Sequence, residues 1–102
     1  MRDAARRAAA SLPSVRRVVL FGSMANGIPT PRSDADLLIV VASSEHAQAR
    51  DRIPPMLAAM SPLPCPVDLF VLTEDELALG EARGDPIVRE ALANGVELLV
   101  AT

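Results

Sequence analysis

The stretch Val18-Val-Leu-Phe-Gly-Ser-Met-Ala-Asn-Gly27 is followed by a polar loop and then by Ser33-Asp-Ala-Asp-Leu-Leu-Ile-Val-Val41. Its order is an apolar strand, a turn at Gly22-Ser23, a loop, an acidic pair and a second apolar strand. Residues two apart in a strand point to the same side, so Asp34 and Asp36 should leave one face together. Like charges side by side repel, and a divalent cation would remove that cost. This acidic pair is the best clue to function.

The bulk properties of the chain favour one small domain over residues 1–102, because half of the 102 residues are apolar. No apolar run approaches the length of a membrane span, and the charged, alanine-rich start lacks the apolar stretch of a secretory signal. The single cysteine, Cys65, cannot form an internal disulfide, so we expect the cytoplasm. A formal charge of −3 without any lysine argues against direct binding of nucleic acid.

Proline, glycine and capping residues mark the ends of alternating helices and strands in the rest of the chain. The pattern predicts an α+β fold (layered α/β) with a mixed sheet of about four strands. Strand 36–41 is nearly all apolar, so it should be central and covered on both faces. The expected strands are 15–21, 36–41, 67–72 and 96–100. The expected helical segments are 2–11, a turn within 23–26, Ser43 or Ser44 to about Arg52, a short piece over roughly 55–60 after Pro54-Pro55 breaks or kinks the preceding helix, a short helix after the capping box of Thr73 and Glu76, and a helix from Asp85 to Asn94-Gly95. Loops are expected over 28–33 and between Gly80 and Gly84.

A third carboxylate, Asp68, lies near the start of the expected strand 67–72. If that strand neighbours strand 36–41, Asp68 can lie beside Asp34 and Asp36. Three carboxylates at one sheet edge form a hard, oxygen-rich site of the kind that Mg²⁺ prefers, with substrate phosphates completing the coordination. Two such ions can clamp the attacking and leaving oxygens of a phosphoryl displacement.

The Gly22-Ser23 turn would supply the other half of such a site. Glycine lets a phosphate approach the backbone, and exposed amides at the start of a helical turn attract anions. The hydroxyl of Ser23 can donate one further hydrogen bond. Positioning and neutralisation of charge provide most of the catalysis in phosphoryl transfer, so a small chain can suffice.

These motifs together resemble the minimal nucleotidyltransferases of the DNA polymerase β-like superfamily, most closely the MNT antitoxin group. The family pattern Gly-Ser-x-Ala-Arg-Gly, spacer, Ser-Asp-x-Asp-Leu corresponds here to Gly22-Ser-Met-Ala-Asn-Gly27 and Ser33-Asp-Ala-Asp-Leu37. The closing segment from Asp85 to Leu99 is similar to the last helix and strand of that group. The likeness covers nearly the whole chain.

The resemblance implies adenylyl transfer from ATP with two Mg²⁺ ions, or Mn²⁺, onto a hydroxyl of a HEPN-domain toxin. Asp34 and Asp36 would hold both metals. Asp68 would bind the catalytic metal and help to deprotonate the acceptor, and Gly22 and Ser23 would grip the triphosphate. Asn26 replaces the usual arginine of the pattern, which would lower affinity if that arginine contacts phosphate or toxin, unless Arg32 substitutes for it.

Other readings of the same residues stay open at this point. The acidic residues could simply flank an apolar strand as solvated gatekeepers. The chain could neutralise a partner by binding alone, with the acidic cluster merely inherited, or it could modify an RNA end or a small molecule. An exposed apolar face would also allow a homodimer or a toxin complex.

Overall fold

The computed structural model describes residues 1–22 and 35–100. Its four strands form one mixed sheet in the order β3-β2-β1-β4, with β2 parallel to β3 and β1 antiparallel to both β2 and β4. This arrangement confirms the expected α+β class with a four-stranded mixed sheet. The elements are α1 (Arg2–Ser11), β1 (Val15–Phe21), β2 (Ala35–Val41), the 3-10 turn η1 (Ala49–Arg52), α2 (Ile53–Met60), β3 (Val67–Thr73), α3 (Glu74–Arg83), α4 (Pro86–Asn94) and β4 (Val96–Val100).

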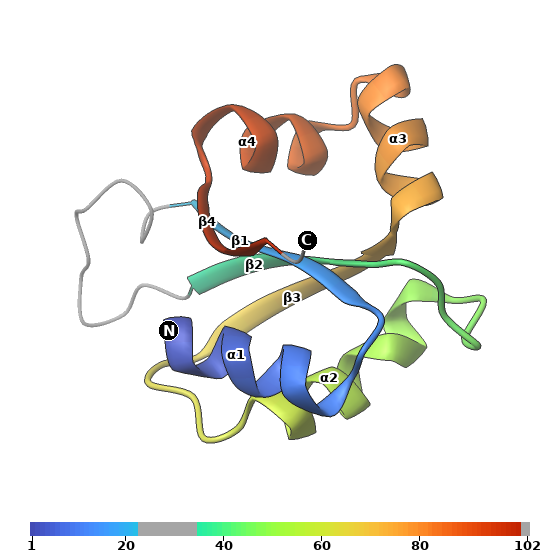
Figure 1. The fold of residues 1–102 in the computed structure, drawn as a ribbon. Coiled ribbons are helices and arrows are strands. Elements are labelled where there is room, and N and C mark those ends of the chain that lie inside the picture. Colours follow the sequence, from blue (N-terminus) through green and yellow to red (C-terminus); the bar gives the residue numbers. More distant parts are fainter. Residues whose placement is uncertain (23–34, 101–102) are drawn as a thin grey trace.

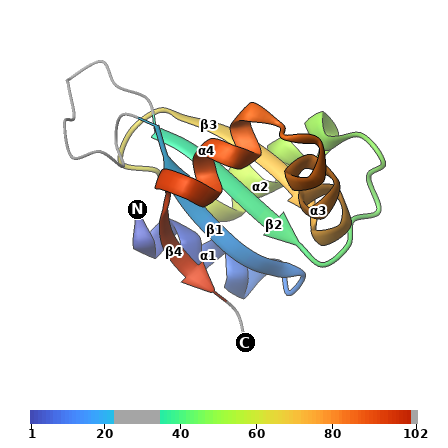
Figure 2. The same cartoon turned by 90° about the horizontal axis from the view of Figure 1, so that it is seen from above.

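Helices cover both faces of the sheet. Figure 1 shows α1 and α2 on one side and α3 and α4 on the other, and Figure 2 shows α4 lying over β1 and β2. The side chains of Leu37, Leu38 and Ile39 are completely buried, so β2 is the central, doubly covered strand that its apolar run predicts. Within the described ranges, no helix has the length and apolar character needed to cross a bilayer.

The helix expected from Ser43 or Ser44 to Arg52 is wrong. The chain bends through residues 43–48 and forms only the 3-10 turn η1 before α2 begins at Ile53. Ser44 does accept a local hydrogen bond, from the amide of His46, but this stabilises a bend. The carbonyls of His46 and Ala47 bind the Arg52 side chain. A long side chain therefore satisfies acceptors that a helix would have satisfied locally.

Two smaller expectations also need correction. The helical piece expected over roughly 55–60 is confirmed as α2, but it begins at Ile53, so Pro54 and Pro55 lie in its first turn, where amides have no intrahelical partner, and do not precede it. The loop expected between Gly80 and Gly84 is the last turn of α3, which ends only at the left-handed Gly84. A Cβ on Gly80 would come within 3.0 Å of Val88, so glycine here lets α4 pack closely against α3.

The predicted capping residues at the starts of α3 and α4 are confirmed. Thr73 and Glu76 form the reciprocal hydrogen bonds of a capping box, and Asp85 accepts from the amides of Ile87 and Val88 at the start of α4. The helical turn expected within 23–26 and the loop expected over 28–33 lie outside the described residues.

Candidate active site

The structure brings together two of the three carboxylates that the sequence singled out. Strands β2 and β3 run parallel, and Asp36 is the register partner of Asp68. Partners in a parallel ladder lie at the same level and project from the same face of the sheet. The two side chains therefore leave neighbouring strands side by side, as expected if strands two and three are neighbours.

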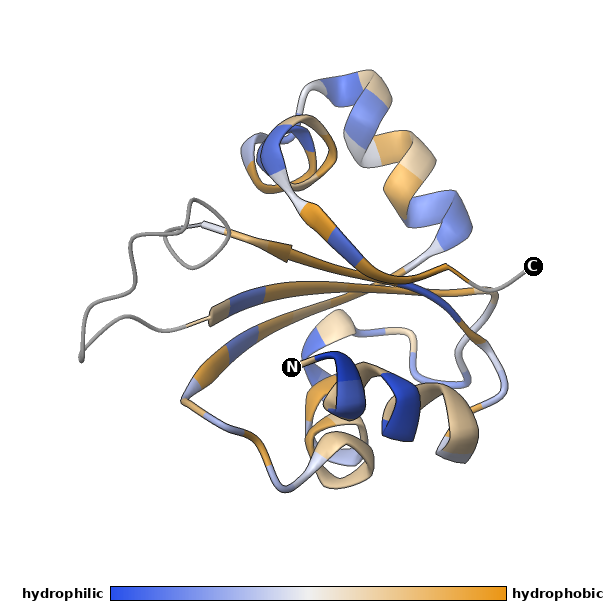
Figure 3. Ribbon diagram, turned by 60° about the vertical axis from the view of Figure 1, so that its left-hand side comes forward, coloured by the Kyte–Doolittle hydropathy of each residue, from blue (hydrophilic) through white to orange (hydrophobic). Residues whose placement is uncertain are grey.

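The beginnings of β2 and β3 are held at one level by a backbone hydrogen bond. The amide of Ala35 donates to the carbonyl of Pro66, with a distance of 3.0 Å between nitrogen and oxygen. Asp36 is half-buried and Asp68 is exposed. In Figure 3, hydrophilic segments interrupt the otherwise apolar sheet near the beginnings of two neighbouring strands. A solvent-accessible pair of carboxylates at a rigid strand edge has the donor chemistry of a divalent cation site.

Gly22 follows the end of β1 and lies directly against Asp36. Its φ is 78°, in the left-handed region that favours glycine. A Cβ on Gly22 would lie 2.3 Å from Oδ2 of Asp36, which is far inside van der Waals contact. The turn and the acidic strand therefore meet at one point, and the site has no room there for a larger residue.

The chain's two aromatic residues lie next to the carboxylates. Phe21 is the antiparallel register partner of Asp36 on β1, and Phe70 follows Asp68 by two positions on the same face of β3. Their ring centroids are 5.9 Å apart with a tilt of 46°, which is a favourable geometry for aromatic side chains. This pair forms an apolar wall beside the acidic edge and anchors the end of β1.

The other expected site residues, Asp34 and Ser23, lie outside the described residues, as do Asn26 and Arg32. Within residues 1–22 and 35–100, no three His, Cys, Asp or Glu side chains cluster closely enough to hold a metal ion. The structure therefore shows the Asp36–Asp68 half of the expected site together with Gly22.

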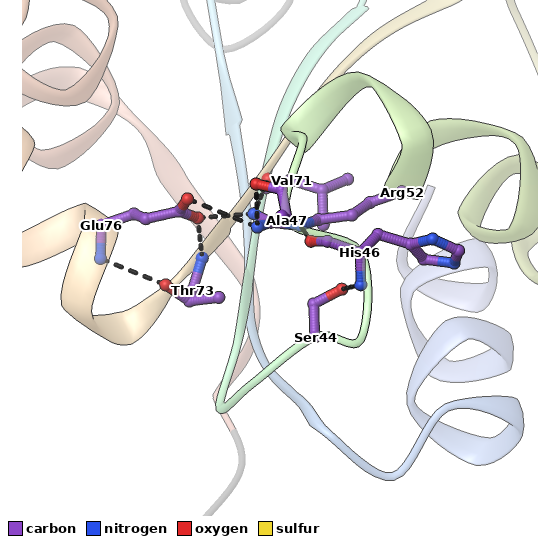
Figure 4. Close-up of polar contacts among 7 residues, drawn as sticks. All are labelled: Ser44, His46, Ala47, Arg52, Val71, Thr73 and Glu76. Carbon is purple, nitrogen blue, oxygen red and sulfur yellow. Dashed lines mark hydrogen bonds and ion pairs between the residues drawn. The ribbon is translucent and has the colours of Figure 1, made fainter.

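A polar cluster that the sequence did not indicate lies at the opposite end of β2 and β3. Arg52 is 5% exposed and donates five hydrogen bonds, to the carbonyls of His46, Ala47 and Val71 and to both carboxylate oxygens of Glu76 (Figure 4). The hydrogen bond from Arg52 lowers the pKa of Glu76, against the smaller opposing effect of burial. Each of the five N–H donors of the guanidinium has a protein acceptor, so Arg52 ties loop, strand and helix together.

A cavity of about 300 Å³ opens beside Arg52, lined partly by Val41, Ser43, His46 and Val71. Val41 and Val71 lie near the carboxyl ends of β2 and β3, whereas Asp36 and Asp68 lie at the starts of the same strands. The cavity is therefore separate from the acidic edge, and the guanidinium beside it is already committed to structural contacts.

A family model described as "Nucleotidyltransferase domain" matches residues 2–97. The chain belongs to this nucleotidyltransferase family. The matched range includes the Gly-Ser turn, the acidic pair and Asp68, so the superfamily that the sequence motifs resemble is confirmed. A search of curated proteins gave no significant match.

Solved structures confirm the nucleotidyltransferase fold. A candidate nucleotidyltransferase from Sulfolobus solfataricus superimposes with a TM-score of 0.62 at 25% identity, over 94% of this chain and 73% of that chain. A toxin–antitoxin structure with AMP-PNP gives 0.68 at 22% identity, over 99% and 74%. A variant of the toxin–antitoxin MntA-HpeT gives 0.63 at 19% identity, over 100% and 75%. In that variant, two aspartates separated by one residue are both replaced by glutamate.

Proposed function

We propose that this nucleotidyltransferase domain transfers AMP from ATP to a hydroxyl of a partner protein, with release of pyrophosphate, as the antitoxin of a toxin–antitoxin pair with a HEPN-type toxin. The observation that carries the proposal is the parallel register of Asp36 and Asp68, at the edge where Gly22 follows the end of β1 and meets Asp36. Acidic ligands and a phosphate-accessible turn are the two parts that nucleotidyl transfer needs in one place.

The residues at this edge fit a divalent cation with a nucleotide. Carboxylate oxygens are the ligands that Mg²⁺ and Mn²⁺ take, and glycine at position 22 adds no side chain of its own between the turn and a phosphate. We assign Asp34, Asp36 and Asp68 as the metal ligands, and Gly22 and Ser23 as the residues that bind the triphosphate. When bound, the metal would neutralise charge on the phosphates.

Asp68 is the residue best placed to accept the proton of the acceptor hydroxyl. It is exposed, whereas Asp36 is half-buried between β1 and β3, so Asp68 is the member of the pair that an incoming partner can reach. The apolar wall of Phe21 and Phe70 limits access of water on the inner side.

The solved toxin–antitoxin structures support the choice of substrate and partner. One of them contains AMP-PNP, which is an analogue of ATP, so we take ATP as the nucleotide here. The other carries substitutions at two aspartates with the same spacing as Asp34 and Asp36. That spacing supports the acidic pair as functional ligands in this chain as well.

Label transfer tests the proposal. The protein is incubated with ATP labelled on the α-phosphate, Mg²⁺ or Mn²⁺, and a HEPN protein encoded beside it, and label on that partner is the expected result. Asp36→Asn and Asp68→Asn should each abolish the label while the circular dichroism spectrum is kept. Asp51→Asn, at an exposed carboxylate of η1, is the control that should keep full transfer.

Two outcomes would contradict the proposed reaction. Absence of label on the correct partner would argue against an enzyme. A variant lacking Asp34, Asp36 and Asp68 that still neutralises the toxin in full would show that binding alone is sufficient. Label on RNA or on a small molecule would keep the chemistry and change the acceptor.

A further inference from the structure

We propose that Gly22 is a positioning residue for the carboxylate of Asp36. Oδ2 of Asp36 occupies the space that a side chain at position 22 would need. Glycine would therefore be required to keep this carboxylate in its orientation, even without a bound nucleotide. This inference rests on the proposed function for its meaning, because it assigns to Gly22 a role toward a metal ligand in addition to phosphate binding.

The distances identify the carboxylate as the group that a side chain would meet. A Cβ on Gly22 would lie 2.3 Å from Oδ2 of Asp36, 3.3 Å from Cγ and 3.6 Å from Cβ. The distance increases steadily from the carboxylate oxygen toward the backbone of β2. Non-bonded carbon atoms attract best at about 3.5–4.0 Å and an oxygen atom is only slightly smaller, so a distance of 2.3 Å between this Cβ and Oδ2 is a severe overlap.

The residue before Gly22 and the residue after Asp36 are both packed into the core, whereas the contact itself is made by the end of a flexible side chain. Phe21, which precedes Gly22, is 5% exposed, pairs with Asp36 in the ladder and packs its ring against Phe70. Leu37, which follows Asp36, is completely buried. The Asp36 side chain, in contrast, can rotate about two bonds. An alanine at position 22 would therefore displace the carboxylate from its orientation, and a metal site tolerates only about 0.5 Å of such movement.

Gly84 provides a matched control for the backbone conformation. Its φ is 72°, close to the 78° of Gly22, so alanine meets the same left-handed backbone at both positions. A Cβ on Gly84, however, would only touch Cδ of Arg89 at 3.8 Å, which is an ordinary contact. Any difference between Gly22→Ala and Gly84→Ala that is specific to Asp36 therefore reports the contact with the carboxylate.

Two measurements without nucleotide or partner test the inference. The first is Mn²⁺ binding followed by electron paramagnetic resonance, and the second is the side-chain carboxyl ¹³C chemical shift of Asp36 at fixed neutral pH. Gly22→Ala should weaken Mn²⁺ binding by about tenfold or more, as changes that disturb ligand orientation do, and should move the Asp36 carboxyl signal. Gly84→Ala should change neither, although both variants lose similar stability.

An unchanged carboxyl signal in folded Gly22→Ala would overturn the inference, whatever happens to nucleotide binding. If Gly22→Ala does not fold, the double variant Gly22→Ala with Asp36→Ala decides the question. Recovery of folding in the double variant supports the inference. A double variant that still does not fold shows that glycine is needed for its φ alone, which overturns the inference. If the unaltered protein binds no Mn²⁺ without nucleotide, the chemical shift decides alone. Failure of AMP transfer would end the proposed function and leave these results intact.

Discussion

Asp36 on β2 and Asp68 on β3 are partners in a parallel ladder, so two carboxylates project side by side from one face of the sheet. Like charges on adjacent strands weaken the pairing of those strands. The central position of β2 and the backbone hydrogen bond from Ala35 to Pro66 hold the two strand starts at one level despite this repulsion. In the proposed function, these two carboxylates would already lie side by side before a cation binds.

Replacement of Asp68 should uncouple the stability of the protein from divalent cations. We expect Mg²⁺ or Mn²⁺ to raise the melting temperature of the unaltered protein, since a ligand at a hundred times its Kd adds about 2.7 kcal/mol. Asp68→Asn should lose most of that increase, while its stability without metal stays within about 0.5 kcal/mol because a repulsion is removed. Thermal unfolding with and without metal measures both effects. An equal increase in Asp68→Asn would exclude Asp68 as a ligand, and Asp51→Asn should behave as the unaltered protein.

Truncation of Arg52 should be among the most destabilising changes in the chain. The side chain is 6% exposed and donates to three carbonyls and to Glu76, so Arg52→Ala leaves several acceptors without their donor. The Glu76 side chain is 38% exposed and stays hydrated without Arg52, so we expect the loss to come mainly from the carbonyl acceptors, at about 1–3 kcal/mol for each one left buried without a donor. Urea unfolding measures the loss. Arg50→Ala removes an exposed arginine from the same 3-10 turn and should change stability by less than about 0.5 kcal/mol. Similar losses of stability in the two variants would contradict the role of Arg52 in joining loop, strand and helix.

Protonation of Glu76 should contribute to acid destabilisation. The hydrogen bond from Arg52 lowers the pKa of Glu76 below its ordinary value of 4.5, so the unfolded chain binds the proton more tightly than the folded protein. The contribution of Glu76 to stability is therefore complete above pH 4.5 and is lost as the pH falls through the lowered folded-state value. Urea unfolding as a function of pH should show a shallower acid limb in Glu76→Gln. An acid limb identical to that of the unaltered protein would refute this assignment.

Truncation of Leu38 should test the central core of the sheet. The side chain is completely buried in the cluster that also contains Val19, Val40 and Ala91 of α4, so Leu38→Ala should cost about 2–5 kcal/mol through lost burial and the cavity left behind. Chemical unfolding gives the value. Leu79→Ala is the control, because that side chain is 48% exposed on α3 and should cost much less. Equal costs would contradict the packing described for β2.

The strands and most helix ends could be predicted because their signals are local. Strands 15–21 and 96–100 have the bounds that the apolar runs indicated, and Thr73 and Asp85 cap helices with hydrogen bonds to amides two or three residues away. The segment 43–52 could not be predicted in this way. Its conformation depends on Arg52, whose acceptors on Val71 and Glu76 come from β3 and α3. The sequence of the segment alone does not show that Arg52 finds acceptors on these distant elements.

The residues of the acidic edge and of the glycine turn can be identified from the sequence alone, because both are short motifs with fixed spacing. The proximity of these two motifs in space is decided only by the tertiary structure. Asp68 becomes the neighbour of Asp36 through the parallel pairing of β2 with β3, and Gly22 reaches the Asp36 carboxylate through the antiparallel pairing of β1 with β2. Both pairings join strands that are separated in the chain, and which strands become neighbours depends on how strands and helices pack around one core, which no single segment of the sequence encodes.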